Sequence, residues 1–121
     1  MKVLIAESDP ALGGLWRRHL QRRGMDVCLV AGQDGAASAL DAQRFDVIIL
    51  NICLEEGSAL AISDLASYRH PDTRVIFVTN TSFFSDGSIF GLSPNACAYV
   101  QTDTPPDDLV AMVEHYGRAA V

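Results

Sequence analysis

The sequence has no long hydrophobic run and no excess of positive charge, and each absence removes a class of protein. None of its apolar runs approaches the roughly 20 residues that a membrane-spanning helix needs. A net charge of −6 and a sequence pI near 4.8 argue against nucleic acid as the main ligand. We therefore expect a protein that neither spans a membrane nor binds nucleic acid directly.

Paired cysteines are also lacking. The three cysteines are odd in number, lie far apart and form no C-x-x-C pair. Such spacing is typical of reduced, buried thiols and does not favour a disulfide framework, a metal site or a redox pair. We therefore predict buried free thiols at Cys28, Cys53 and Cys97.

Signals for secretion and for phosphate binding are missing as well. Glu7 directly follows the first short apolar run, which is too early for a secretory signal, so we expect a cytoplasmic chain. The pair Gly13-Gly14 does not complete a G-x-G-x-x-G pattern, so a nucleotide or flavin site has little support. With 121 residues and neither a linker nor a repeat, the chain has the size of a single domain, 1–121.

The apolar stretch at residues 45–54 is the one around which the chain is organised. A run of this kind, with polar residues on both sides, predicts a central strand buried on both faces, and we place its tip at Asn51. In open parallel sheets, ligands bind beyond the carboxyl ends of the strands. Any local chemistry is therefore expected near Asn51, where it is limited by what an amide can do.

Short strands and helices alternate along the rest of the chain, which predicts a parallel sheet covered by helices on both faces. We expect further strands at 2–6, 25–30, 74–79 and 96–100. Helices are expected from Pro10 to Gly24, after an Asp34 cap, from Gly57-Ser58 to His70, and from Pro105 behind a Thr104 cap. Their expected inward-facing residues are Leu12, Leu15, Trp16 and Leu20; Ala37 and Leu40; Leu60, Ile62 and Leu65; and Leu109, Met112, Val113 and Tyr116.

Residues 80–95 do not fit this regular pattern. Four serines and two glycines give the segment a low helix propensity, so we predict a short or distorted helix. Its large apolar side chains either pack in the core or form an exposed patch, and they are Phe83, Phe84, Ile89, Phe90 and Leu92.

Four arginines crowd the first expected helix: Arg17, Arg18, Arg22 and Arg23. The simpler interpretation is a solvated face whose last two arginines are favoured by the dipole at the helix C-terminus. The alternative is a surface that meets an acidic partner.

Four stretches carry a shared pattern in their order and spacing. Residues 3–10 are a strand and an acidic loop, residues 45–60 are the central strand with a Leu-Glu-Glu-Gly-Ser turn, residues 70–79 lead to a threonine, and residues 98–100 are Ala-Tyr-Val. Together they resemble the receiver domain of bacterial response regulators. The resemblance implies an α/β, flavodoxin-like (βα)5 three-layer sandwich with a five-stranded parallel sheet in the order 2-1-3-4-5.

The resemblance also carries the functional positions of that family onto this sequence. The family uses an acidic pair to hold Mg²⁺, an aspartate to accept the phosphoryl group, a switch hydroxyl with an aromatic partner, and a lysine. Only the hydroxyl and the aromatic match here. The positions are Glu7 and Ser8, with Asp9 beside them, for the acidic pocket; Asn51 for the acceptor; Thr79 and Tyr99 for the switch; and Thr102 for the lysine.

Each departure from the family pattern removes a step of phosphotransfer. An amide has no anionic nucleophile, so Asn51 should not be phosphorylated. Mg²⁺ is usually bound by carboxylates, and Ser8 and Asn51 replace two of them. Mg²⁺ binding should therefore be weak or absent, and no other cofactor is implied. Thr102 removes the cation that would hold the phosphoryl group. Because these losses agree with one another, we predict a domain released from phosphotransfer as a unit.

The expected function is that of a non-enzymatic pseudo-receiver. It would act as a phosphorylation-independent interaction module in bacterial signal transduction or transcription control. In the family the output face is formed by the fourth helix, the fifth strand and the fifth helix, so we expect a protein partner or a second copy there, with contacts at Phe83, Phe84 and Tyr99. An effector domain is compatible with the position of Val121 just after the last helix.

Two alternatives remain open. The domain could still be switched by weak metal binding or by phosphorylation of a substitute carboxylate, for which the candidates are Asp9, Glu55 and Glu56. It could also be a small flavodoxin-like enzyme with Cys53 as nucleophile, which would require a base or cation beside the thiol. Nothing in the sequence brings the histidines near Cys53, because His19 and His115 fall on expected helices and His70 on a helix end.

Overall fold

The computed structural model describes residues 1–79 and 95–119. Five parallel strands form one sheet in the order β2-β1-β3-β4-β5, as the resemblance to receiver domains implies. The elements are β1 (Lys2–Ala6), α1 (Pro10–Arg22), β2 (Asp26–Val30), α2 (Gln33–Ala42), β3 (Val47–Asn51), α3 (Ala59–Arg69), β4 (Arg74–Thr79), β5 (Ala96–Gln101) and α5 (Pro106–Ala119). The short helix expected within residues 80–95 lies almost wholly outside the described residues, as do Phe83 and Phe84.

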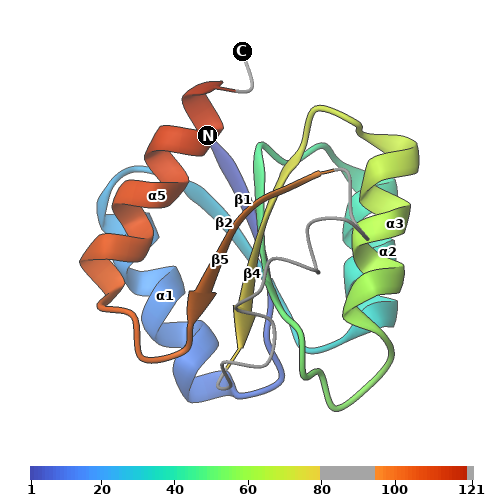
Figure 1. The fold of residues 1–121 in the computed structure, drawn as a ribbon, viewed down its shortest axis with the longest axis horizontal. Helices are drawn as coiled ribbons and strands as arrows, with labels where there is room; N and C mark the ends of the chain where they lie inside the picture. The colour runs from blue at the N-terminus through green and yellow to red at the C-terminus, as the bar shows by residue number, and fades with distance from the viewer. Residues whose placement is uncertain (80–94, 120–121) are drawn as a thin grey trace.

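The molecule has three layers, with α1 and α5 on one face of the sheet and α2 and α3 on the other (Figure 1). Alternate residues of the central strands supply the two cores, because successive side chains on a strand point to opposite faces. Val3 and Ile49 pack with α1 and α5, whereas Leu4 and Ile48 pack with α2 and α3. All five residues of β3 are buried, as expected for a strand covered on both faces.

Two of the four described helices start where the capping signals in the sequence predict. Asp9 caps α1 by accepting a hydrogen bond from the Ala11 N–H at 3.0 Å, and Pro10 occupies the first turn. Ser58 caps α3 through the Ala61 N–H at 3.3 Å. Gly24 follows α1 with a φ of 83°, a left-handed conformation that favours glycine at the end of a helix.

Two helix starts differ from the sequence prediction. Asp34 lies in the first turn of α2 and does not cap it, because the helix begins at Gln33 behind Gly32. With that start, Ala36 takes the fully buried position that was expected for Ala37. The last helix begins at Pro106, one residue later than expected, because the Pro105 carbonyl accepts the first helical hydrogen bonds from Asp108 and Leu109.

Gly13, near the start of α1, has a packing role. A Cβ on Gly13 would lie 2.7 Å from Leu29 Cδ1, which is closer than ordinary van der Waals contact. Gly13 therefore lets α1 approach β2, and this contact offsets the low helix propensity of glycine.

The cysteines are all free, but the prediction that all are buried is wrong for Cys53, which is exposed in the loop after β3. Cys28 and Cys97 are partly buried in the sheet. Within residues 1–79 and 95–119, no helix is both long enough and apolar enough to cross a membrane.

Candidate functional site

The candidate site lies at the carboxyl edge of the sheet, where the loops after β1 and β3 meet. Ala6 pairs with Leu50 across these two strands, so the residues that follow, Glu7 and Asn51, lie side by side. A pocket of about 290 Å³ opens here, lined by Glu7, Ser8, Asp9, Leu12, Asn51, Cys53, Glu55 and Thr102. The fold thus brings together the positions equivalent to the acidic pocket, the acceptor and the lysine.

The side chain of Asn51 is bound directly to Glu7. Its Nδ2 donates to Glu7 Oε2 at 2.5 Å, and its Oδ1 accepts from the Cys53 N–H at 2.8 Å. Glu7 and Asn51 are both buried, at 5% and 8% exposure. A buried carboxylate is costly without such partners, so the amide stabilises Glu7 at this edge of the sheet.

Glu7 uses both carboxylate oxygens inside the protein. Oε1 accepts the backbone N–H of Asp9 at 3.1 Å, while Oε2 accepts from Asn51. An N–H donor therefore faces each oxygen, and a cation bound there would have to displace it. In the described part of the chain, no group of three or more His, Cys, Asp or Glu residues is placed to hold a metal ion.

Ser8 ties together three loops that are far apart in the sequence. Its hydroxyl donates to the Ala31 carbonyl at 2.8 Å, and the same oxygen accepts the Glu55 N–H at 2.9 Å. The loops after β1, β2 and β3 are thereby joined through a single side chain. From the sequence, Ser8 was expected only as a lost carboxylate, and this bridge was not predicted.

Gln33 forms a second bridge, which no pattern in the sequence predicted. Its backbone N–H donates to the Glu56 carbonyl at 3.2 Å, and its Oε1 accepts the Ser58 N–H at 2.8 Å. Gly57 sits between these contacts with a φ of 84°. Gly57, which follows the two glutamates, indicated a turn in the sequence. Nothing in the sequence indicated that Gln33 of another loop would bind this turn.

The switch positions lie on the neighbouring strands. Thr79 is fully buried at the end of β4, and its carbonyl accepts the Thr102 N–H at 2.8 Å. Tyr99 on β5 is partly buried and packs against the core between the sheet and α2 and α3. The hydrogen bonds described for the Asn51 side chain go to Glu7 and Cys53.

The thiols differ in their surroundings. Burial raises the pKa of the Cys97 thiol from 9.0 to about 11, although the charge of Arg74 opposes the shift. Cys53 lines the pocket beside Asn51, but among the described residues that line it there is no histidine. A nucleophilic cysteine needs a base or cation beside it, and this pocket offers carboxylates instead.

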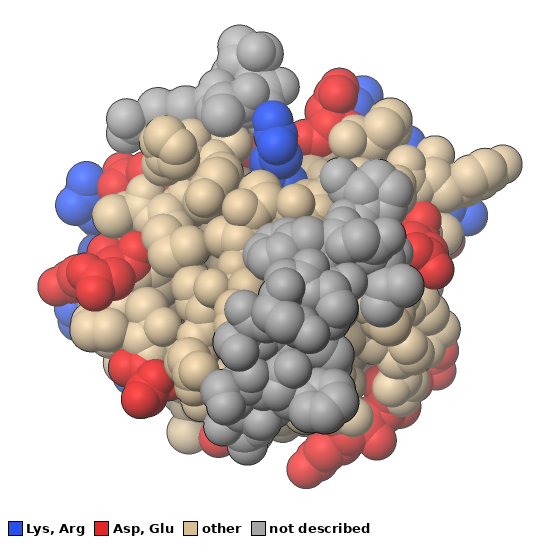
Figure 2. Space-filling model, in the orientation of Figure 1, with Lys and Arg blue, Asp and Glu red and all other residues tan. Residues whose placement is uncertain are grey.

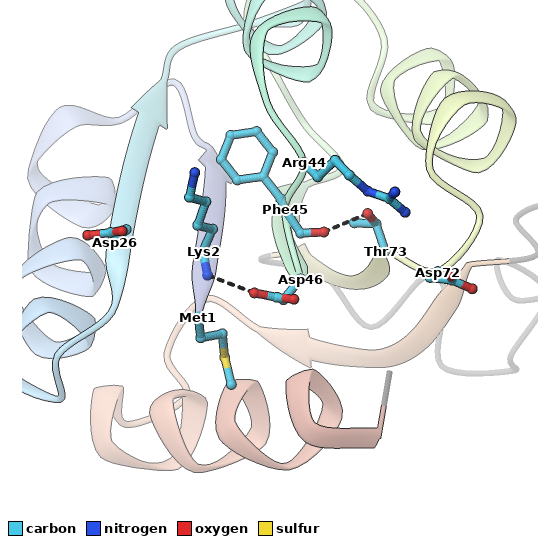
Figure 3. Close-up of a pocket in the computed structure, with 8 residues that line it drawn as sticks. All are labelled: Met1, Lys2, Asp26, Arg44, Phe45, Asp46, Asp72 and Thr73. Atoms are coloured by element: carbon cyan, nitrogen blue, oxygen red, sulfur yellow. Dashed lines mark hydrogen bonds between the residues drawn. The ribbon is translucent and has the colours of Figure 1, made fainter. Parts of the chain in front are cut away.

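A larger cavity, of about 570 Å³, lies at the opposite, amino end of the strands. Figure 3 shows that its lining combines acidic and basic side chains, with the Lys2 N–H donating to Asp46 at 2.8 Å and the Thr73 hydroxyl donating to the Phe45 carbonyl at 2.6 Å. Both contacts involve the backbone and hold strand ends together. These structural contacts therefore account for polar groups that line the larger cavity, and the smaller pocket remains the candidate site.

Comparisons with known proteins find similar chains among response regulators. The chain is 33% identical over 115 residues to the response regulator protein PmrA of Pseudomonas aeruginosa, a match that covers 93% of this chain and 51% of PmrA. It thus spans about half the length of this curated relative. Among solved structures, a CheY-like receiver domain protein from Methanospirillum hungatei has a TM-score of 0.88 at 21% identity, with 98% of this chain and 94% of that chain covered.

A second solved structure has the same fold. A response regulator protein from Burkholderia pseudomallei has a TM-score of 0.83 at 20% identity, covering 98% of this chain and 69% of that one, and it contains a phosphorylated aspartic acid and a calcium ion. Residues 3–114 of the present chain match the response regulator receiver domain family. Together with the sheet order and the pocket at its carboxyl edge, this match shows that the chain belongs to the receiver domains of two-component signalling.

Proposed function

We propose that this chain is a pseudo-receiver that works in two-component signalling without being phosphorylated. The observation that carries the proposal is the Asn51–Glu7 hydrogen bond at the acceptor position. An amide nitrogen donating to a buried carboxylate has no free electron pair with which to attack phosphorus, and the amide oxygen is neutral and already accepts the Cys53 N–H. The position thus serves structure in place of phosphoryl transfer.

Weak or absent Mg²⁺ binding is part of this proposal. Mg²⁺ needs near-octahedral oxygen coordination and normally relies on carboxylates. Here the oxygens of Glu7 face N–H donors, and Ser8 is engaged by the backbone on both sides. Asp9 and Glu55 line the pocket, but Asp9 caps α1. No cofactor is needed for the proposed role.

The output would be a protein contact on a face that includes β5 and α5. Figure 2 shows that the described surface over β5 and the adjoining side of α5 is largely uncharged, which suits a protein interface more than a nucleic-acid contact. We propose Tyr99, together with Phe83 and Phe84, as contacts for a protein partner or a second copy. The domain would act in the cytoplasm, where two-component signalling takes place.

A further domain is proposed for the full protein. PmrA is about twice as long as its matched region, and the chain aligns with only 51% of it. An effector domain, such as one that controls transcription, would read out the receiver in the complete protein.

The first test is the intact mass of the protein after incubation with Mg²⁺ and acetyl phosphate. We expect no phosphoryl adduct on the natural protein or on Asn51→Asp alone, and partial labelling of the triple variant Asn51→Asp/Ser8→Asp/Thr102→Lys, which restores the missing groups. An adduct on the natural protein would refute the proposal. Peptide mapping would then name the substitute acceptor among Asp9, Glu55 and Glu56.

The partner face has its own test, in the full-length protein. Phe84→Asp should abolish the output, and thermal unfolding of the variant separates a lost contact from a folding defect. Tyr68→Asp is the matched control, because Tyr68 is an aromatic on α3 with 87% exposure and lies outside the proposed face. Equal loss of output in both variants would contradict the assignment of the face.

A further inference from the structure

β2 lies at one end of the sheet and pairs in a continuous register with a single neighbour, β1. One side of its backbone therefore has no partner strand among the described residues. Edge strands are usually protected from further pairing by lysine, proline or a bulge. β2 has the sequence Asp-Val-Cys-Leu-Val, which contains neither lysine nor proline and whose only charged residue is Asp26 at the start. The outer edge of β2 thus lacks the usual protection against pairing with another strand.

The hydrogen bonds to β1 show which backbone groups of β2 face outward. The Asp26 N–H donates to a carbonyl directly before β1, and the Val30 carbonyl accepts an N–H directly after β1, each at 3.0 Å. Backbone groups alternate in direction along a parallel strand, so Val27 and Leu29 direct their N–H and C=O groups away from β1. We call these two N–H and two C=O groups the free edge of β2.

The backbone groups on either side of the free edge are already engaged. Just before β2, the Met25 N–H donates to a carbonyl in the last turn of α1 at 3.3 Å. Just after β2, the Ala31 carbonyl accepts a side-chain hydroxyl from the loop after β1 at 2.8 Å. An added strand must therefore match the short set of groups on Val27 and Leu29, which restricts its register.

We propose that two copies of this chain associate through the free edge of β2, as antiparallel neighbours related by a two-fold axis at Cys28. In this register Val27 of each copy exchanges both N–H···O bonds with Leu29 of the other copy, so every group of both free edges is paired. Moving the axis by one residue in either direction would require Met25 or Ala31, whose groups are engaged. A two-fold contact also closes on itself and leaves no further edge of this kind.

Cys28 would lie directly opposite Cys28 of the second copy. The two residues form the non-hydrogen-bonded pair between the bonded pairs, with a Cα–Cα distance of about 4.5 Å. This distance lies within the range of roughly 4.4–6.8 Å that a disulfide spans. Cys28 is partly buried, and together with Val27 it lines a hollow of about 70 Å³, so it is not sealed in the core. Its thiol can therefore report on the proposed contact.

A second copy suits this edge better than other strands do. A parallel copy would add head to tail and expose the next free edge, so the assembly would not close. An unrelated peptide strand gains its specificity from pockets for its side chains, whereas Val27 and Leu29 pack into the core beside α1. The inference goes beyond the proposed function, because it depends neither on Asn51 nor on the partner face at β5 and α5.

The first test is amide hydrogen exchange of the natural protein by NMR, at about 50 μM and about 1 mM. The contact is small, so we expect weak association with a Kd on the order of 0.1–1 mM. High salt in both samples screens the repulsion between copies of net charge −6. Exchange at Val27 and Leu29 should slow by about two- to threefold at the higher concentration, in proportion to the fraction associated. Exchange at Cys28, whose N–H faces β1, should not change.

The second test is the rate of disulfide formation with diamide, which takes up the two hydrogens that two thiols lose. One sample, Cys53→Ser/Cys97→Ala, keeps only Cys28, and its matched control, Cys28→Ser/Cys97→Ala, keeps only Cys53. Random collision favours Cys53, because it is the exposed thiol. Pairing of the free edges favours Cys28, so the dimer linked through Cys28 should form at least about fivefold faster.

Cys28→Lys is the disrupting variant, because it places two positive charges opposite each other across the axis. It should abolish the concentration dependence of exchange at Leu29, whereas Cys28→Ser should retain it, and thermal unfolding of both variants checks that the fold is kept. Exchange at Val27 and Leu29 that does not depend on concentration in the natural protein would overturn the proposal. Faster dimer formation through Cys53 than through Cys28 would overturn it as well.

Discussion

The two ends of the sheet carry cavities that differ in size and in how their polar groups are held. At the amino end, the cavity of about 570 Å³ is crossed by contacts from side chains to the backbone of neighbouring strand ends, such as Thr73 to the Phe45 carbonyl. At the carboxyl end, the pocket of about 290 Å³ contains a buried pair of side chains, Glu7 and Asn51. The smaller pocket thus contains a buried polar pair that its volume alone does not reveal.

The difference reflects how parallel sheets are built. At the amino ends the strands are entered from helices, and the polar groups there complete the backbone hydrogen bonds of those entries. At the carboxyl ends the loops leave the sheet, and their side chains are free to be used for ligands. In this chain two of the side chains at the carboxyl end, Glu7 and Asn51, bind each other.

The largest expected effect comes from restoring a carboxylate at the carboxyl end. Asn51→Asp replaces the N–H donor of Glu7 by a second negative charge in a buried position, so the free energy of unfolding should fall by about 2–3 kcal/mol at neutral pH. Urea denaturation in the presence of a chelator measures this loss. Millimolar Mg²⁺ should recover part of it in the variant and leave the natural protein unchanged.

Asn51→Ala is the control for this experiment. It also removes the donor to Glu7 but adds no charge, so it should be destabilised without responding to Mg²⁺. Equal stability of the natural protein and Asn51→Asp under chelation would show that the Glu7 contact is not what holds this edge together. The contrast between the two ends would then be wrong.

A matched pair of hydroxyl deletions compares the two ends directly. Thr73→Val should cost about 1–2 kcal/mol, because Thr73 is 3% exposed and its loss leaves the Phe45 carbonyl buried without its partner. Ser8→Ala should cost less, about 0.5–1 kcal/mol, because water can reach the exposed Ala31 and Glu55 that it bridges. Chemical denaturation of both variants under identical conditions measures the difference. A larger loss in Ser8→Ala would mean that the loop bridge is a main support of the fold.

The sequence predicted the strands more fully than the contacts between loops. The bounds of β1 and β4 agree with prediction because each is an apolar run that ends sharply in polar residues. The tip of β3 at Asn51 was also correct, and its position beyond a buried strand located the pocket. Periodicity and capping chemistry act over a few residues, so one sequence is enough to show them.

Contacts between loops could not be predicted in the same way. The Ser8 hydroxyl binds residues that are 23 and 47 positions away, and no local pattern marks such partners. The start of α2 was misplaced for a related reason, since the Gln33 N–H is held by the Glu56 carbonyl of another loop. The exposure of Cys53 follows from the turn that Asn51 makes with the Cys53 N–H, which a count of apolar neighbours does not reveal.

Deprotonation of the Cys97 thiol, in the amino half of β5, should slightly lower the free energy of unfolding at alkaline pH. Burial raises the pKa of Cys97 to about 11, so the folded state holds the thiol proton more tightly than the unfolded chain does. The contribution is complete below pH 9.0 and is lost as the pH rises through about 11. Because Cys97 is only partly buried, we expect a loss below about 1 kcal/mol. Unfolding free energies of the natural protein and Cys97→Ala across this window measure it, and parallel curves would contradict the assignment.

The smallest effect separates the thiols of the two ends by their access to solvent. Cys53 is exposed at the rim of the carboxyl-end pocket, whereas Cys97 is partly buried and its thiol donates to the Val75 carbonyl at 3.5 Å. Brief treatment with iodoacetamide near neutral pH should therefore label Cys53 first, and intact mass should show a single adduct that Cys53→Ser removes. Cys53→Ser should leave stability within about 0.5 kcal/mol of the natural value, because its side chain lies at the surface. Faster labelling of Cys97 than of Cys53 would mean that the edge of the sheet at β5 opens more readily than the loop that closes the pocket.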